Sequence, residues 1–185
     1  MKIHLETPEE IRHQIWKELG RATQDRHHEW RTPVLATVGQ DGWPRARTVV
    51  LRRADALAGQ LDIYTDSRSP KVAQMRAQPL AQFVFWSARL SWQLRVRVQV
   101  DVMCGQQVEE LWHVVRQSAS AGDYLTVAAP GEPLAADPGL GEVATPAVSF
   151  AVLRAHVVDM DWLELSRNGH RRAQLGPQAW RWLTP

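Results

Sequence analysis

The stretch SWQLRVRVQVDVM, residues 91–103, decides the fold that this sequence predicts. Its apolar residues occupy every second position, namely Trp92, Leu94, Val96, Val98, Val100 and Val102. A period of two over this length is typical of an antiparallel strand with one buried face. The other face carries arginine and glutamine. We expect it either to meet solvent or to face a ligand or a partner subunit.

Further strands are predicted on both sides of this stretch. The upstream strands are 33–39, 46–53, 61–65 and 81–87, with a hairpin turn at Gln40, Asp41 and Gly42. The downstream strands are 147–165, with an interruption at 159–161, and a closing hairpin of 170–175 and 180–183 with Gly176 and Pro177 in its turn. Strands in this order, with helices inserted between them, predict one α+β domain over residues 1–185, built on a small antiparallel barrel.

Three helices are predicted from periodicity and capping. The first spans about 7–21, because Thr7, Pro8 and Glu10 form a capping box and apolar residues then recur every fourth position. The others are 70–77 and 105–118. Residues 120–146 are rich in Ala, Gly and Pro and predict a long loop with one short helical turn, and long loops are often functional.

Composition excludes several classes of protein. A single cysteine, Cys104, rules out an intrachain disulfide and a Cys-based metal cluster, and it fits a reducing, cytoplasmic setting. No apolar run is long enough to span a bilayer, so no membrane association is expected. The net charge is +2 and the arginines are dispersed, which does not indicate nucleic-acid binding. His27 and His28 have no acid or cysteine at ligand spacing, so no metal site is expected.

The stretch YTDSRSPKVAQM, residues 64–75, is the strongest candidate for a binding site. It predicts a strand end, a polar turn and a helix that starts with Ser69 as N-cap and Pro70 in the first turn. Arg68 and Lys71 stand beside a helix start that already favours anions. Hydroxyls, amides and cations that converge in this way are typical of a phosphate cradle. The alternative is an ordinary strand–turn–helix with solvated basic residues.

The order of these motifs resembles the pyridoxamine 5′-phosphate oxidase family, the FMN-binding split barrels. RTVVLR (47–52) is similar to the family's Arg-x-Val-Leu-Leu-Lys strand, and Tyr64 with Thr65 matches its aromatic–Thr pair. Ser69 and Lys71 match its phosphate-binding Ser-x-Lys. Pro70 stands where the family has Arg, so Arg68 is expected to supply the guanidinium from a shifted position.

The second half of the chain carries further likenesses. Gln93 follows Trp86 by the spacing of the family's Trp-x6-Gln strand, whose Gln reaches FMN bound mainly by the other subunit. Trp162 resembles the Trp beside the flavin, and His170 and Arg172 resemble its His-x-Arg pair. Together the resemblance implies FMN contacts at Arg47, Thr48, Val49, Val50, Leu51, Arg52, Tyr64, Thr65, Arg68, Ser69, Lys71, Gln93, Trp162 and Arg172.

The family's substrate-binding residues are matched less completely in this sequence. Arg116 and Ser120 share the spacing of the family's substrate-phosphate residues, and His170 is a further candidate, but Trp112 replaces the family's Tyr and Asn168 its Arg. The resemblance therefore implies an FMN-dependent oxidoreductase, an oxidase or reductase of unassigned substrate, acting as a homodimer with FMN at the subunit interface. No catalytic residue is assigned. The alternatives are a true pyridoxamine/pyridoxine 5′-phosphate oxidase that makes pyridoxal 5′-phosphate, a non-catalytic flavin-binding module, and a structural barrel with an acidic partner.

Overall fold

The computed structural model describes residues 7–126, 128–133, 148–176 and 179–185. Its helices are α1 (Pro8–Gln24), α2 (Pro70–Ala77) and α3 (Glu109–Val115), with 3₁₀ turns η1 (Glu29–Arg31), η2 (Gly105–Val108) and η3 (Ala121–Tyr124). Its strands are β1 (Val34–Val38), β2 (Pro44–Thr48), β3 (Leu51–Asp55), β4 (Gln60–Asp66), β5 (Leu80–Ser87), β6 (Trp92–Cys104), β7 (Phe150–Glu164), β8 (Arg171–Leu175) and β9 (Trp180–Leu183).

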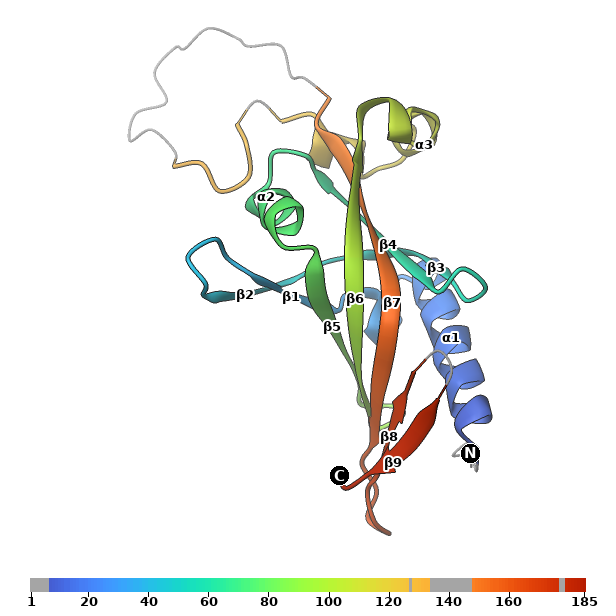
Figure 1. Cartoon of the computed structure of the whole chain (residues 1–185). Helices are drawn as coiled ribbons and strands as arrows, with labels where there is room; N and C mark the ends of the chain where they lie inside the picture. Colours follow the sequence, from blue (N-terminus) through green and yellow to red (C-terminus); the bar gives the residue numbers. More distant parts are fainter. Residues whose placement is uncertain (1–6, 127, 134–147, 177–178) are drawn as a thin grey trace, which may run out of the picture.

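Across these ranges the strands form one antiparallel sheet in the order β2-β1-β5-β6-β7-β4-β3, with β8 beside β7 and β9 beside β8. The predicted alternating strand is β6, and its partner β7 runs beside it from Glu164 opposite Trp92 to Ala151 opposite Cys104. This long two-stranded ribbon runs along the length of the molecule in Figure 1. We call its Cys104 end, beside α2 and α3, the cradle end, and its Trp92 end, beside β8 and β9, the hairpin end (Figure 1).

The prediction of one strand over 46–53 is wrong. Strand pairing stops at Val49 and Val50, which lie between β2 and β3. As a result β2 pairs with β1 at one edge of the sheet, and β3 pairs with β4 at the opposite edge. Val49 still donates its amide to the carbonyl of Pro33 at 3.0 Å. Sequence alternation could not reveal this break, because both halves have strand-like composition and only their partners differ.

The predicted interruption at 159–161 is also wrong, since β7 is continuous. A bulge lies next to it instead, where Val157 pairs with Val98 and Asp159 pairs with Arg97. Asp159 and Asp161 fit within the strand because Arg97 and Arg95 on β6 bind their carboxylates. Cross-strand ion pairs thus offset the low strand preference of aspartate.

The helices differ from the predictions mainly at their ends. α1 has the predicted capping box and buries Ile11, Ile15 and Leu19, but it runs one turn further, to Gln24. The predicted helix 105–118 is a 3₁₀ turn followed by the shorter α3. The helical turn expected in 120–146 is η3, whereas residues 127 and 134–146 of that loop, and Pro177 of the closing turn, lie outside the described residues.

Two groups of buried side chains hold the described elements together. The larger lies between α1 with η1 and one face of the sheet, and it contains Trp30, Phe83, Phe85, Trp92 and Trp162. The smaller lies at the cradle end, where Tyr124 and Phe150 pack beside Trp112 of α3. None of the described helices is long and apolar enough to cross a membrane.

Candidate functional site

A cavity of about 280 Å³ opens at the cradle end, where the chain passes from β2 to β3. Its walls come from the β2–β3 break, the end of β4, the start of α2 and the segment around η3. The lining residues are Thr48, Val49, Val50, Arg52, Ile63, Tyr64, Thr65, Asp66, Lys71, Asp123, Tyr124 and Pro130. The structure therefore brings together residues from the RTVVLR stretch and from the YTDSRSPK stretch, which the sequence singled out separately.

Lys71 forms the cationic side of this cavity. Its Nζ donates to Thr65 Oγ1 at 2.9 Å and to Ser69 Oγ at 2.8 Å. Both acceptors are neutral, so the ammonium charge is not cancelled by them. Burial, with the nearby Arg47 guanidinium adding to it, lowers the pKa of Lys71, and Asp66 acts in the opposite direction. A half-buried ammonium next to a second cation is stabilised by a bound anion.

Arg47 is the second cation near Lys71, and uncharged acceptors hold its guanidinium in place. Its guanidinium donates to Thr37 Oγ1 at 2.7 Å, to Gln74 Oε1 at 2.8 Å and to the carbonyl of Leu35 at 3.2 Å. Burial lowers the pKa of Arg47, and Arg45 adds to this effect. The two cations thus give this part of the site a positive potential.

Arg52 forms a second polar group in the cavity, after the break in the strand. Its guanidinium carbon lies 5.7 Å from the centre of the Tyr64 ring, and its buried Nε has no hydrogen-bond partner among the described residues. Burial raises the pKa of Tyr64 and of Tyr124, and Arg52 opposes both shifts. The two phenols therefore stay protonated near neutral pH and can donate hydrogen bonds.

The break between β2 and β3 also resolves a geometric conflict. In one regular strand, Arg47 and Arg52 would point to opposite faces. Because the chain changes pairing partner between them, Arg47 reaches Gln74 of α2 while Arg52 lines the cavity. Leu51 is fully buried and belongs to the core.

Ser69 and Arg68 differ in detail from what their motifs suggest. Ser69 is the N-cap residue of α2, as predicted. However, its side chain accepts a hydrogen bond from Lys71 Nζ and makes no capping hydrogen bond. Arg68 binds the carboxylate of Asp66, with Nη2 at 2.7 Å from Oδ2, and also donates to the carbonyl of Thr126 at 2.9 Å. Asp66 holds the pKa of Arg68 above its ordinary value. The expected flavin contact of Arg68 stays a prediction.

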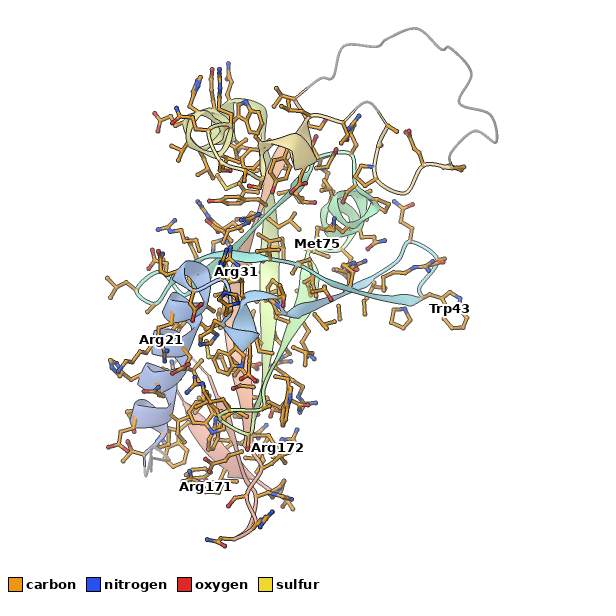
Figure 2. The ribbon with its side chains drawn as sticks, turned by 180° about the vertical axis from the view of Figure 1, so that it is seen from behind. Arg21, Arg31, Trp43, Met75, Arg171 and Arg172 are labelled. Atoms are coloured by element: carbon orange, nitrogen blue, oxygen red, sulfur yellow. The ribbon has the colours of Figure 1, made fainter. Side chains whose placement is uncertain are left out.

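Gln93, Trp162 and Arg172 lie at the hairpin end, away from the cavity. Gln93 stands directly opposite Trp86 on β5, so the Trp-x6-Gln spacing is that of a cross-strand pair. Trp162 is fully buried and packs at 5.3 Å against Trp92. Figure 2 shows Arg172 near one extremity of the molecule and Met75 of α2 well away from it. The structure of the single chain therefore separates the predicted flavin contacts into two groups.

Arginines at the hairpin end are held by carboxylates. Arg172 donates to Asp161 Oδ1 at 3.0 Å and to Oδ2 at 2.8 Å, and Arg95 binds the same carboxylate. Burial works against ionisation of Asp161, but the hydrogen bonds from Arg172 and Arg95 keep its pKa below the ordinary value. Arg172 is therefore an ion-pair partner of Asp161 as well as a predicted flavin contact.

The substrate candidates are divided in the same way. Arg116 and Ser120 follow α3 at the cradle end, where Arg116 is exposed and Ser120 Oγ is 2.9 Å from Ser118 Oγ. His170 is at the hairpin end, where its Nδ1 accepts from the amide of Ser166 at 3.1 Å. It lines a separate cavity of about 580 Å³ with Ser91, Leu165, Ser166, Arg167 and Asn168.

Sequence reasoning missed Tyr124 and Asp123 as lining residues. Tyr124 is nearly fully buried, packs at 5.1 Å against the Phe150 ring and borders the cavity beside Arg52. The only sequence signal was a lone aromatic residue in a segment without periodicity, and such a residue does not reveal which strand it will meet.

Comparisons with known proteins show the family of this chain. A family model described as pyridoxamine 5′-phosphate oxidase, FMN-binding domain, matches residues 13–104. The pyridoxine/pyridoxamine 5′-phosphate oxidase of Thermosynechococcus vestitus is 42% identical over 67 residues, which are 36% of this chain and 31% of that protein. The pyridoxine/pyridoxamine 5′-phosphate oxidase 2 of Arabidopsis thaliana is 25% identical over 169 residues, which cover 83% of this chain and 84% of that protein. The chain spans less than half the length of the first curated relatives it matches.

Solved structures share the fold along the whole chain. A pyridoxamine 5′-phosphate oxidase-related, FMN-binding protein from Nostoc punctiforme has a TM-score of 0.72 at 24% identity, covering 98% of this chain and 100% of that one. PhzG from Burkholderia lata, solved with tetrahydrophenazine-1-carboxylic acid, has a TM-score of 0.71 at 18% identity and full coverage of both chains. The antiparallel sheet, open between β2 and β3 in the described residues, is thus the expected split barrel. The chain belongs to the pyridoxamine 5′-phosphate oxidase-related family of FMN-binding split barrels, and FMN is the cofactor of its matched domain.

Proposed function

We propose that this protein is an FMN-dependent oxidoreductase, an oxidase or reductase of a small molecule, with the flavin phosphate held beside Lys71. The observation that carries this proposal is the convergence of Lys71, Arg52 and the β2–β3 break on one cavity. In this family's FMN-binding domain, that convergence supports a site that holds the phosphate and one side of the cofactor.

The residues of the cavity fit FMN chemically. The phosphate needs cations and hydroxyl or amide donors, which Lys71, Thr65 and the start of α2 offer. A flat ring with apolar faces needs aliphatic and aromatic walls, and Val49, Val50 and Tyr64 supply them. When bound, the flavin supplies hydride and electron transfer, and the protein orients it and excludes water.

We propose a homodimer in which each flavin site takes residues from both subunits. Gln93 and Cys104 are eleven residues apart on β6, which is about 35 Å along a strand and far longer than an FMN molecule. One flavin therefore cannot touch both Lys71 at the cradle end and Gln93 at the hairpin end of the same protomer. A second protomer running in the opposite direction would bring its hairpin end to the first protomer's cavity.

An exposed apolar surface supports the same assembly. Val34 and Val38 of β1 and Leu80 and Trp86 of β5 are between 38% and 55% exposed on neighbouring strands. Val38 and Leu80 border a cavity of about 420 Å³ that Arg97 and Val158, near the middle of the ribbon, also line. Contiguous apolar area of this kind usually marks a protein interface.

The visible absorption spectrum of the purified protein tests the cofactor, before and after addition of excess FMN and desalting. Flavin bands that remain after desalting, and that bleach when a candidate substrate or NAD(P)H is added without oxygen, support the oxidoreductase. Bands that remain but never bleach with any reductant or substrate favour the non-catalytic flavin-binding module. A colourless protein that retains no FMN contradicts the proposal.

Light scattering of the flavin-loaded protein tests the dimer. The expected mass is twice that of the chain, with one flavin per chain by absorbance. A monomer that retains flavin through the column would show that one protomer is sufficient, and the shared site would have to be abandoned.

The narrower function of a pyridoxamine/pyridoxine 5′-phosphate oxidase is supported by the names of the curated relatives and by the exposed Arg116 at the cradle end. Trp112 opposes it, because its ring packs at 5.4 Å against Phe150 and carries no hydroxyl for a substrate phosphate. Pyridoxal 5′-phosphate formation from pyridoxamine 5′-phosphate, measured by absorbance, separates this function from the broader one.

A further inference from the structure

The turn between β5 and β6, residues 88–91, is held by a carboxylate from outside the sheet. Glu29 of η1 accepts from the amide of Ala88 at 3.1 Å and from the amide of Arg89 at 3.3 Å, and its Oε2 also binds Ser87 Oγ. Ser87 is fully buried, and its Oγ also accepts from the amide of Leu90 at 3.1 Å. These bonds, with the Ser87 hydroxyl as the leading cause, lower the pKa of Glu29, so it remains ionised at neutral pH.

A second carboxylate, from α1, holds the same turn by its side chain. Glu18 is only 1% exposed, and its Oε2 accepts from Arg89 Nη2 at 2.6 Å. The same carboxylate is bound by Gln14 Nε2 at 3.0 Å and by His28 Nε2 at 2.9 Å. A buried carboxylate is costly unless it is fully hydrogen-bonded, and this network satisfies it.

The network rests on the aromatic core rather than on mobile surface groups. His28 Nδ1 accepts from the amide of Trp30 at 3.1 Å, which leaves Nε2 as the donor to Glu18. Trp30 is fully buried and packs at 5.6 Å against Phe85 and at 6.4 Å against Trp92. The two acids therefore connect α1 and η1 rigidly to the turn.

The turn leads directly to residues expected at the flavin. Gln93 follows it by two positions, opposite Trp86 on β5. The carbonyl of Ser91 accepts from the amide of Leu165 at 2.8 Å, which ties the turn to the segment that carries His170. Any displacement of the turn would thus move Gln93 and the neighbouring loop together.

We propose that Glu29, supported by Glu18, is a positioning residue for the flavin site. It does not touch the cofactor, but it fixes the β5–β6 turn so that Gln93 is presented to the FMN of the partner subunit. This inference rests on the proposed shared flavin site and adds to it a role for the N-terminal helix and η1. Preorganisation of this kind improves affinity because the order is present before the ligand arrives.

A double-mutant cycle on FMN affinity tests the inference, with the full chain titrated by flavin fluorescence. Gln93→Ala is expected to raise the FMN Kd by about tenfold, which is ~1.4 kcal/mol. Glu29→Ala is expected to raise it by about fivefold, and the double variant by no more than about tenfold, since a positioning residue has nothing to position once Gln93 is gone.

Asp55→Ala is the matched control. Asp55 also accepts from two turn amides, those of Leu57 at 3.1 Å and Ala58 at 3.0 Å, but in the β3–β4 turn. Glu29→Ala and Asp55→Ala are expected to shift the melting temperature of the apoprotein by similar amounts, while only Glu29→Ala changes the FMN Kd. If Glu29→Ala does not fold, Glu29→Gln keeps the size of the side chain and removes its charge.

Three results would overturn the inference. If Gln93→Ala weakens FMN binding and Glu29→Ala does not, the positioning role is wrong but the shared site stands. If the two losses multiply in the double variant, Glu29 acts independently of Gln93. If Gln93→Ala binds FMN like the parent, the shared site itself is wrong, and the positioning role is lost with it.

Discussion

The two ends of the β6–β7 ribbon use arginine and lysine in different ways. At the hairpin end, Arg95 and Arg172 share the carboxylate of Asp161, and Arg171 binds Glu164. At the cradle end, Lys71 and Arg47 have only hydroxyl, amide and carbonyl acceptors among the described residues. The arginines named at the hairpin end are therefore neutralised within the fold, whereas Lys71 and Arg47 are not, although the neighbouring Arg68 is paired with Asp66.

This difference shows where an anion gains most by binding. A phosphate near Lys71 offsets the burial of its ammonium and the repulsion from Arg47, which in that order lower the pKa of Lys71. A phosphate near Arg172 would have to compete with a carboxylate already in place. We therefore expect changes to Lys71 and Arg47 to act on FMN affinity, and changes to the ion pairs of Asp161 to act first on stability.

The largest effect is expected from removal of the cradle cations. Lys71→Ala and Arg47→Ala should each weaken FMN binding by about 1.5–3 kcal/mol, the typical worth of a charge-assisted hydrogen bond. Fluorescence titration of the apoprotein measures this loss. Arg68→Ala is the matched control, because Asp66 already neutralises that guanidinium and a smaller loss is expected. Parent-like FMN binding by either cradle variant would mean that the phosphate lies elsewhere.

At the hairpin end, Asp161→Asn should lower the free energy of unfolding by about 1–2 kcal/mol, because it leaves two half-buried guanidinium groups without their carboxylate. Urea unfolding of the apoprotein measures the change. Asp41→Asn, which loosens an exposed pair with Arg45, should cost little. Equal losses in the two variants would show that the hairpin-end pairs stabilise no more than a surface ion pair.

The pH dependence of FMN affinity tests whether the Lys71 ammonium binds the phosphate. Its ammonium attracts the phosphate only below its pKa, which burial and Arg47 lower in the folded protein. FMN affinity should therefore be full near neutral pH and fall as the pH rises through this lowered pKa. In Lys71→Arg, whose guanidinium stays charged throughout, the same titrations should show a flatter profile. Identical profiles in the two proteins would exclude Lys71 as the titrating group.

The smallest effect is expected at the second polar group of the cavity. Tyr124→Phe removes a hydroxyl but keeps the ring that packs against Phe150, so the melting temperature should hardly change. FMN affinity should fall by about 0.5–1.5 kcal/mol if the hydroxyl donates to the cofactor, and by nothing if it serves only the substrate. Titration with FMN, followed by substrate kinetics, distinguishes these two roles.

Much of the architecture was predictable because its signals are local. The capping box of α1 and the alternation in β6 involve neighbours in sequence, and both are present as predicted. The cavity residues around 47–52 and 64–71 were found through motif order, which reflects the family fold. The boundaries of α3 and the break after Thr48 were missed, since neighbouring elements decide them more than local preference does.

The sequence by itself determined most of the strands and helices, and it indicated which cations are candidates for phosphate binding. The tertiary structure decided which of those cations keep their charge for a ligand. Arg68 and Lys71 are nearly adjacent in sequence, yet Arg68 is bound by Asp66 and by the distant carbonyl of Thr126, whereas the acceptors of Lys71 among the described residues are hydroxyls. It also decided that Gln93 and Lys71 lie at opposite ends of one ribbon. Ion pairing and strand pairing join residues far apart in the chain, so they depend on contacts that exist only after folding.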